Sequence, residues 1–326
     1  MAGNTLVTGG AGFIGSHVVD ELLKRGHKVV ALDDLSGGFR DNLSPAAQFV
    51  QGSVCDAELV DSLFREYKFE YVFHLAAYAA EGLSHFIKRF NYTNNLIGSI
   101  NLINASVNAG TVKCFVFTSS IAAYGRGQVP MTEDMTPTPE DPYGIAKYAV
   151  ELDLREAHEI FGLNYVVFRP HNVYGERQNI GDPYRNVIGI FMNQILQGKP
   201  MTVFGDGGQT RAFSHISGVA PVLAESALRT GAYNQVFNVG ADKPFTVLAL
   251  ANAVAKAMGV PPTVVHREAR NEVDNAFCLH AKVKQYFGDV IQDVGLEDGL
   301  AGMAKWARLH GPRTGQPFGN IEVALN

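Results

Sequence analysis

The first half of the chain alternates short, continuously apolar runs with longer segments that are apolar on one side only. Continuous apolar runs are typical of parallel strands that helices cover on both faces, and the longer segments show the three- and four-residue spacing of amphipathic helices. Strands are predicted at residues 5–8, 28–33, 47–51, 71–75, 114–120 and 164–169. Helices are predicted between them at residues 12–25, 57–67, 95–109 and 142–161. This order predicts an α/β fold with a doubly wound parallel sheet.

The pattern loosens after about residue 176, where turns rich in glycine and proline separate the helical segments. Helices are expected there at residues 188–197, 219–229, 247–258 and 300–309. We therefore expect two units: a nucleotide-binding domain over residues 1–175 and a smaller α/β substrate-binding lobe over residues 176–326. Some segments of that lobe are expected to return to the main sheet.

A glycine-rich turn lies between the first predicted strand and the first predicted helix, in the stretch Thr-Gly-Gly-Ala-Gly-Phe-Ile-Gly over residues 8–15. Gly9, Gly12 and Gly15 are three residues apart, and Phe13 and Ile14 complete the turn. Such glycines allow a tight turn, close approach of the backbone to a pyrophosphate and close helix–strand packing. The helix N-terminus adds free N–H groups for the phosphates. The turn predicts a Rossmann-type dinucleotide site.

Asp33 closes the second predicted strand, 18 residues after Gly15. A carboxylate at about this spacing binds the adenosine ribose hydroxyls, and its charge repels a 2′-phosphate. The cofactor is therefore expected to be NAD rather than NADP. A solvated residue at the end of a strand is the alternative interpretation, and it suits the neighbouring Asp34.

Tyr143 and Lys147 are four residues apart in Asp-Pro-Tyr-Gly-Ile-Ala-Lys, over residues 141–147. Asp141 is a typical N-cap and Pro142 a typical first helical residue, so both side chains project from one face of a helix. A phenol has a pKa near ~10, and lowering it to about 7 requires roughly 4 kcal/mol from a neighbouring cation. Such a tyrosine can take a proton from a substrate hydroxyl. By spacing alone, an ordinary packing pair is the more common explanation.

Composition excludes several classes of protein. The 326 residues carry a formal net charge of −5, with 46% hydrophobic and 18% charged residues, and no basic stripe suggests nucleic-acid binding. No apolar run reaches the length of a membrane span, and no charged leader precedes the first strand. The three cysteines and ten histidines show no metal-ligand spacing. We expect a cytoplasmic protein without a metal, a nucleic-acid partner or a membrane partner.

Together, the motifs resemble those of the extended short-chain dehydrogenase/reductase family, in particular its NAD-dependent sugar-nucleotide epimerases and dehydratases, such as the UDP-glucose 4-epimerases. The likeness covers nearly the whole chain. It depends on the glycine turn, His-Leu-Ala-Ala at 74–77, Ser-Ser at 119–120 with Tyr-Gly at 124–125, the Tyr143/Lys147 pair, Asn-Val-Tyr-Gly at 172–175 and Phe-Gly-Asp-Gly-Gly-Gln-Thr-Arg at 204–211.

The resemblance implies roles for individual residues. The catalytic residues would be Ser120, Tyr143 and Lys147. The residues that line NAD beyond the glycine turn and Asp33 would be Leu75, Ala76, Ala77, Asn94, Tyr143, Lys147 and His171. The sugar-nucleotide substrate, a UDP-hexose, would be held by Ser120, Asn172, Arg211 and Arg270. Arginine suits a diphosphate because its guanidinium pairs with two oxygens. A homodimer built from the helices at 95–109 and 142–161 is also implied.

By the same resemblance, Tyr143 removes the proton of the sugar 4-hydroxyl while a hydride passes to NAD. Lys147 lowers the pKa of Tyr143, and Ser120 positions the 4-oxygen. Dehydratases of the family carry an acidic pair after the serine, whereas this chain has Ile-Ala-Ala at residues 121–123. Simple 4-epimerisation of a UDP-sugar is therefore favoured. A dehydratase or decarboxylase that uses the same oxidation is the alternative, and a non-catalytic NAD-sensing protein is an alternative of another class.

The chain departs from the family pattern mainly near the substrate. Ser53 replaces an aspartate expected to contact adenine, and His171 replaces an aromatic residue beside the nicotinamide. The segment around Arg270 is one residue short of the expected spacing. These differences leave the identity of the sugar open.

Overall fold

The computed structural model describes residues 2–127, 129–269, 275–315, 318–319 and 321–324, and every structural statement below concerns these residues. No helix in these ranges is long and apolar enough to cross a membrane.

Seven strands of the described chain form one sheet, in the order β11-β6-β5-β4-β1-β2-β3, and every neighbouring pair is parallel. This confirms the predicted fold class, and the six strands predicted from the sequence are all present. Their bounds are β1 Asn4–Thr8, β2 Lys28–Asp33, β3 Gln48–Gln51, β4 Tyr71–His74, β5 Cys114–Thr118 and β6 Tyr165–Pro170, with β11 at Gln235–Val239. The fifth strand was predicted to reach residue 120, but it ends at Thr118 because the chain turns into a 3₁₀ helix at Ile121–Ala123.

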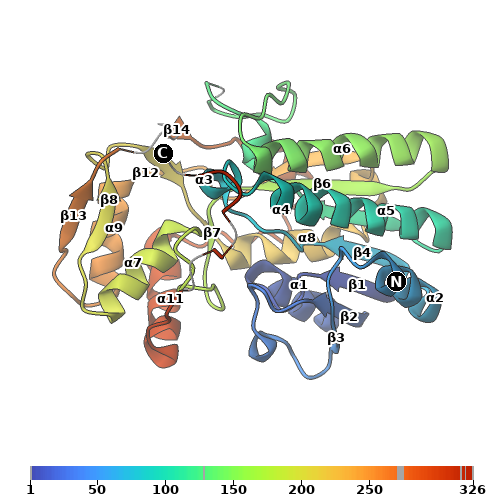
Figure 1. Ribbon diagram of the computed structural model, residues 1–326, viewed down its shortest axis with the longest axis horizontal. Coiled ribbons are helices and arrows are strands. Elements are labelled where there is room, and N and C mark those ends of the chain that lie inside the picture. Colours follow the sequence, from blue (N-terminus) through green and yellow to red (C-terminus); the bar gives the residue numbers. More distant parts are fainter. Residues whose placement is uncertain (1, 128, 270–274, 316–317, 320, 325–326) are drawn as a thin grey trace.

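Helices cover both faces of the sheet (Figure 1). One face packs against α1 (Phe13–Lys24), α8 (Ala220–Ser226) and α10 (Ala281–Phe287). The other face packs against α2 (Ala57–Tyr67), α5 (Gly98–Ala109) and α6 (Pro142–Phe161). Successive side chains of a strand point to opposite faces, and both cores are apolar. The strands therefore have to be apolar throughout, as the sequence pattern indicated.

The helix predicted at residues 95–109 begins with a π-helical turn, Thr93–Ile97, before α5. Short helices α3 (Glu81–Ser84) and α4 (Lys88–Tyr92) precede it, and the sequence pattern did not predict them. Further 3₁₀ turns lie at Arg40–Asn42, Ile216–Gly218 and Thr230–Ala232. α8 ends at Ser226, earlier than the predicted residue 229, because Leu228 N and Arg229 N donate to carbonyls three rather than four residues back.

The C-terminal lobe surrounds a core of its own, built from α7 (Val187–Leu196), α9 (Val247–Ala257) and α11 (Leu296–His310). These helices were predicted, whereas the short strands of the lobe were not. β7 (Val173–Tyr174) pairs with β10 (Ser214–His215), β9 (Thr210–Ala212) pairs with β12 (Pro244–Thr246) and β14 (Asn275–Ala276), and β8 (Met201–Phe204) pairs with β13 (Val264–Arg267). The C-terminal half also contributes α8, α10 and the edge strand β11 to the main sheet.

Candidate active site

A cleft of about 1660 Å³ lies at the carboxyl ends of the strands, against the C-terminal lobe. All of the described residues that the sequence marked as site residues line this one cleft. They are Gly9, Gly12, Phe13, Ile14, Gly15, Asp33, Leu75, Ala76, Ala77, Asn94, Ser120, Tyr143, Lys147, His171, Asn172 and Arg211. Arg270 lies outside the described residues.

The glycine turn has no room for side chains at two of its positions. Gly9 has a φ of +66°, and a Cβ there would lie 2.7 Å from the Ala76 nitrogen. A Cβ at Gly15 would lie 2.0 Å from the Gly9 carbonyl oxygen. Only glycine lets α1 start so close to β1 and to the loop after β4. The first N–H groups of α1 have no partner within the helix, so this end of the cleft suits phosphates.

Asp33 is held at the end of β2 by two backbone amides. Ala11 N donates to its Oδ2 at 3.0 Å and Leu35 N donates to its Oδ1 at 2.8 Å. Burial raises the pKa of Asp33, and these two hydrogen bonds oppose the rise. Asp34, in contrast, is exposed and accepts a bond from Ser36 N. The geometry therefore favours Asp33 over Asp34 as the fixed acceptor in the cleft.

A column of buried polar groups positions the loop after β4. Ser99 donates to the Asn95 carbonyl at 2.7 Å, so its oxygen accepts from His74 Nε2 at 2.8 Å, and His74 Nδ1 accepts from Thr8 at 2.7 Å. The Asn95 side chain accepts from Tyr78 N and donates to Tyr78 O. Burial holds the pKa of His74 well below its usual value, so the ring is a neutral bridge. The sequence showed His74 as a motif residue but gave no signal for Asn95.

The start of α6 follows the prediction. The Asp141 carboxylate accepts from Gly144 N at 2.9 Å, and the helix begins at Pro142. Tyr143 is buried, and the Ser120 side chain is near enough to lower its pKa; the Ser120 hydroxyl accepts from Ala122 N at 3.1 Å. A phenol and a hydroxyl therefore meet at the carboxyl end of β5, as a pair that could hold one sugar oxygen.

Lys147 lies near Tyr143 on the same face of α6. Its Nζ donates to Thr118 O at 2.8 Å and lies 5.8 Å from the centre of the Tyr143 ring. Burial raises the pKa of Tyr143, and the charge of Glu81 raises it further, whereas the Ser120 side chain and the charge of Arg185 lower it. Burial also lowers the pKa of Lys147 to about 7. That Lys147 lowers the pKa of Tyr143 stays a prediction.

The lowered pKa of Lys147 predicts how the stability of the cofactor-free protein depends on pH. The unfolded chain, with a lysine pKa near ~10.4, binds this proton more tightly than the folded chain. The contribution of Lys147 to the free energy of unfolding is therefore largest above about pH 10, and it is lost as the pH falls toward 7. We expect the free energy of unfolding of the wild type, relative to Lys147→Met, to rise by about 1–2 kcal/mol between pH 7 and pH 9. Urea unfolding of both proteins across this range measures it, and a constant difference would show that the pKa of Lys147 is not lowered.

A buried ion pair supports α6 one turn beyond Lys147. The Glu151 carboxylate accepts from the Ser119 hydroxyl and pairs with both Nε and Nη2 of Arg169. The Arg169 guanidinium also lies 4.5 Å from the centre of the Tyr124 ring, and the Tyr124 hydroxyl donates to Asn238 at 2.8 Å. These contacts join β5, α6, β6 and β11 beneath the cleft.

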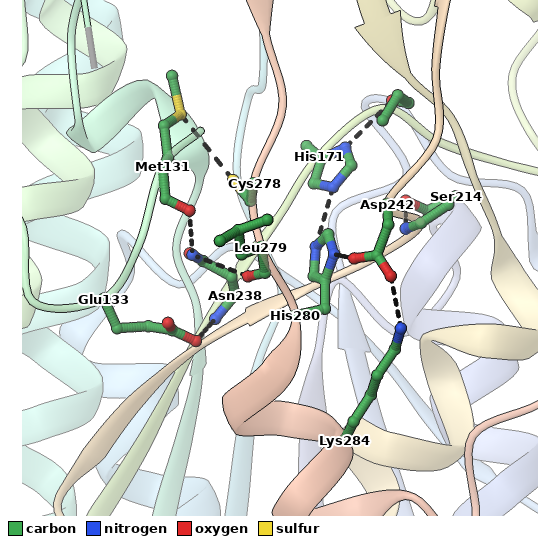
Figure 2. Close-up of polar contacts among 12 residues, drawn as sticks. Met131, Glu133, His171, Ser214, Asn238, Asp242, Cys278, Leu279, His280 and Lys284 are labelled. Atoms are coloured by element: carbon green, nitrogen blue, oxygen red, sulfur yellow. Dashed lines mark hydrogen bonds and ion pairs between the residues drawn. The ribbon is translucent and has the colours of Figure 1, made fainter. Parts of the chain in front are cut away.

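His171 belongs to a second polar network, shown in Figure 2. Its Nδ1 donates to Ala212 O at 3.1 Å and its Nε2 lies 3.1 Å from His280 Nε2; His280 Nδ1 lies 2.6 Å from an Asp242 carboxylate oxygen. Burial, followed by the charge of His280, lowers the pKa of His171 to about 3. His171 is therefore neutral, and it ties the end of β6 to the strand that carries Arg211. Sequence reasoning missed His280 and Asp242, since nothing local marks them.

Two further cleft residues bear on the substrate side. Asn172 has a φ of +40° and donates to the same Ala212 carbonyl at 3.1 Å, while Arg211 lines the cleft from β9. Arg185, which sequence reasoning missed, also lines the cleft, and its Nε donates to Asp182 at 3.1 Å. Among the described residues, no group of three or more His, Cys, Asp or Glu side chains is placed to hold a metal ion.

The cleft fits a dinucleotide. The glycine turn leaves space that a Cβ would fill, and Asp33 offers fixed carboxylate oxygens at the end of β2. Thr118 also lines the cleft, and its buried hydroxyl has no hydrogen-bond partner among the described residues. A buried unpaired hydroxyl is costly, so a ligand hydroxyl beside Thr118 would satisfy it.

Residues 5–240 match the model of the NAD dependent epimerase/dehydratase family. The chain belongs to this family. The match confirms the resemblance drawn from the sequence motifs.

Similar proteins agree with this assignment. The chain is 38% identical over 265 residues to a UDP-glucose 4-epimerase of Mycolicibacterium smegmatis, covering 79% of this chain and 83% of that protein. A UDP-glucose 4-epimerase structure from Thermotoga maritima with UDP-glucose has a TM-score of 0.88 at 36% identity, covering 94% of this chain and 99% of that chain. One from Thermus thermophilus with NAD has a TM-score of 0.84 at 32% identity, covering 93% and 98%.

Proposed function

We propose that this member of the NAD-dependent epimerase/dehydratase family is a UDP-sugar 4-epimerase that interconverts UDP-glucose and UDP-galactose, or a closely related pair of UDP-hexoses. The observation that carries the proposal is that Ser120 and Tyr143 line the same cleft as the glycine turn and Asp33, with the Ser120 side chain near enough to lower the pKa of Tyr143. The relatives named UDP-glucose 4-epimerase support it.

Bound NAD would supply the acceptor, and later the donor, of the hydride at sugar C4. Asp33 would bind the adenosine ribose, and the remaining cofactor contacts would come from the glycine turn, Leu75, Ala76, Ala77, Asn94, Lys147 and His171. Tyr143 would take the proton of the 4-hydroxyl and return it, while Ser120 holds the 4-oxygen. Asn172 and Arg211 would anchor the diphosphate, so that the oxidised sugar can turn and present its other face.

Elimination of water needs an acid or base near C5 and C6 of the sugar. The turn after Ser120 offers none, because Ile121, Ala122 and Ala123 have apolar side chains. Ile121 and Ala123 are buried, and Ala122 lines the cleft. One observation keeps a dehydratase as the second candidate. Glu81 lines the cleft, and its charge raises the pKa of Tyr143, so a carboxylate is near the reacting end.

The products distinguish these functions. We would incubate the purified protein with UDP-glucose, UDP-galactose and their N-acetyl and uronic forms, and identify the products by NMR and mass spectrometry. A 4-epimer of unchanged mass supports the proposal. Loss of water or carbon dioxide would instead identify a dehydratase or decarboxylase, and NAD binding without turnover of any sugar would indicate an NAD-sensing protein.

We also propose a homodimer in which α5 and α6 pair with the same helices of a second copy. Large apolar side chains are exposed along α6: Ile145 and Leu152, seven residues apart, are 40% and 38% exposed, and Ile160 is 64% exposed. Exposed apolar residues gathered on one helix are typical of an interface.

We further infer a reducing compartment such as the cytoplasm, which the free cysteines support.

Leu152→Glu is expected to turn the dimer into a monomer, because it places a charge in the apolar interface. Light scattering coupled to gel filtration measures the mass. The matched control is Leu309→Glu, since Leu309 is 83% exposed on α11, far along the chain from α5 and α6. A Leu152→Glu protein that remains a dimer would show that another surface forms the contact.

A further inference from the structure

The chain continues past α11 and crosses to the opposite side of the cleft. Gly311, with a φ of +71°, ends the helix, and described residues after it lie near α3 (dark red in Figure 1). We name the described residues 313–315, 318–319 and 321–323 the strap.

The first anchor of the strap lies on the C-terminal lobe. Arg313 N donates to Asn193 Oδ1 and Asn193 Nδ2 donates to Arg313 O, both at 2.9 Å. The Arg313 guanidinium lies 3.9 Å from the centre of the Phe39 ring, and Phe39 N donates to Ala11 O in the glycine turn. Arg313 therefore joins α7 to the nucleotide-binding half.

The second anchor lies on α4. Glu322 carboxylate oxygens accept from Arg89 N at 2.7 Å and Phe90 N at 2.9 Å, in the first turn of that helix. The backbone N–H groups of Glu322 and Val323 donate to Phe86 O at 2.8 and 3.2 Å. One side chain and two backbone groups thus clip the strap to the far side of the cleft.

Between the anchors, the strap lines the cleft itself through Phe318 and Ile321. The Phe318 ring centre is 5.3 Å from that of Tyr78 and 4.9 Å from that of Phe90. Its side chain also packs against the buried cluster of Ala80, Leu83 and Ile87.

Hydrogen bonds connect this aromatic group to the start of the Tyr143 helix. Tyr78 is bonded through its backbone to Asn95, Asn95 donates to Asn91, and Asn91 donates to the Pro142 carbonyl next to Tyr143. Independently, the charge of Glu81, three residues after Tyr78, acts on the pKa of Tyr143. The strap therefore packs on the segment that faces Tyr143 across the same cleft.

We propose that the strap forms a wall of the sugar site and selects the sugar. The proposal rests on the proposed function. Phe318 and Ile321 present apolar surface without a donor or acceptor. A neutral hexose can place its C–H face against such a wall, whereas an acetamido or carboxylate group there would lose hydrogen bonds to water. Phe318 would exclude polar substituents of the sugar from this side of the site, and Glu322 would hold the strap in place.

Point variants distinguish a contact between the strap and the sugar from a general effect of the strap on folding stability. Glu322→Ala is expected to raise the KM for UDP-glucose about 10-fold with kcat changed less than about 3-fold, because a ground-state contact is lost. Phe318→Ala is expected to raise the ratio of kcat/KM for UDP-N-acetylglucosamine over UDP-glucose about 10-fold. Leu309→Ala is the control, since its side chain is 83% exposed on α11 and outside the strap, and it should leave both quantities unchanged.

Calorimetric titration makes the test independent of turnover. The quantity is the ratio of the Kd for UDP to the Kd for UDP-glucose, which isolates the contribution of the sugar. Glu322→Ala should lower this ratio about 10-fold while the Kd for UDP stays within about 2-fold of the wild type. If the ratio and the substrate preference stay unchanged in correctly folded variants, or if UDP binding weakens equally, the strap does not form the sugar wall.

Different results would contradict the proposed 4-epimerase function and the proposed role of the strap. A wild-type protein that binds UDP-glucose more tightly than UDP, but makes no 4-epimer, contradicts the proposed function and leaves the titration to decide the role of the strap. A wild-type protein that makes the 4-epimer, but whose Kd ratio and substrate preference do not change in the strap variants, keeps the proposed function and overturns the role of the strap.

Discussion

Tyr143→Phe should reduce epimerisation of UDP-glucose at least about 1,000-fold, because it removes the only hydroxyl proposed to take the substrate proton. The phenyl ring fills the same buried space, so the fold and the glycine turn should be unaffected. Bound NAD should therefore remain, and its content is measured by absorbance after denaturation alongside the rate of product formation.

Tyr148→Phe is the matched control for this variant. Tyr148 lies on the same helix, only partly buried, and it is not among the residues that line the cleft. Its loss of a hydroxyl should leave the rate within about 2-fold, the size of an ordinary surface change. A Tyr143→Phe protein with normal kcat would show that another group takes the proton.

Glu151→Ala should lower the free energy of unfolding by about 3–5 kcal/mol, because it leaves the buried Arg169 charge without its partner. Arg169 is 3% exposed, and its Nη1 already lacks a partner among the described residues. The Ser119 hydroxyl would lose its acceptor as well. Urea unfolding at neutral pH measures the loss.

A double replacement tests the cause. Glu151→Leu combined with Arg169→Met removes both charges and keeps apolar volume, so it should recover most of the stability lost in Glu151→Ala. If the double variant is as unstable as the single one, the loss comes from packing rather than from the unpaired charge. A loss below about 1 kcal/mol in the single variant would show that water reaches the pair.

Local signals in the sequence predicted the fold and much of the cleft. Continuous apolar runs predicted the parallel strands, and the Asp141–Pro142 cap predicted the start of α6. The glycine turn and Asp33 were recognisable because their chemistry is local: a backbone without side chains, and a carboxylate at the end of a strand. Residues whose role depends on nearby residues in the sequence were therefore predictable.

Contacts between distant segments were not predictable. The pairing of His171 with His280 spans 109 residues, and the bonds from Arg89 and Phe90 to Glu322 span more than 230. The orientation of the Lys147 side chain was not predictable either, because it also depends on a distant segment. Its spacing from Tyr143 placed both on one helix face, but the direction of its ammonium was set by the Thr118 carbonyl on another element.

Strand β11 has a consequence for how the protein is made. β6 is synthesised about 65 residues before the strand that covers its edge, and until then its backbone groups and Phe168 lack their partners from β11. An uncovered apolar strand edge is a template for pairing with other chains. A fragment ending near residue 175 would keep the glycine turn and the Tyr143 helix yet be prone to aggregate. The C-terminal half thus completes the main sheet through β11 and also builds the far wall of the cleft.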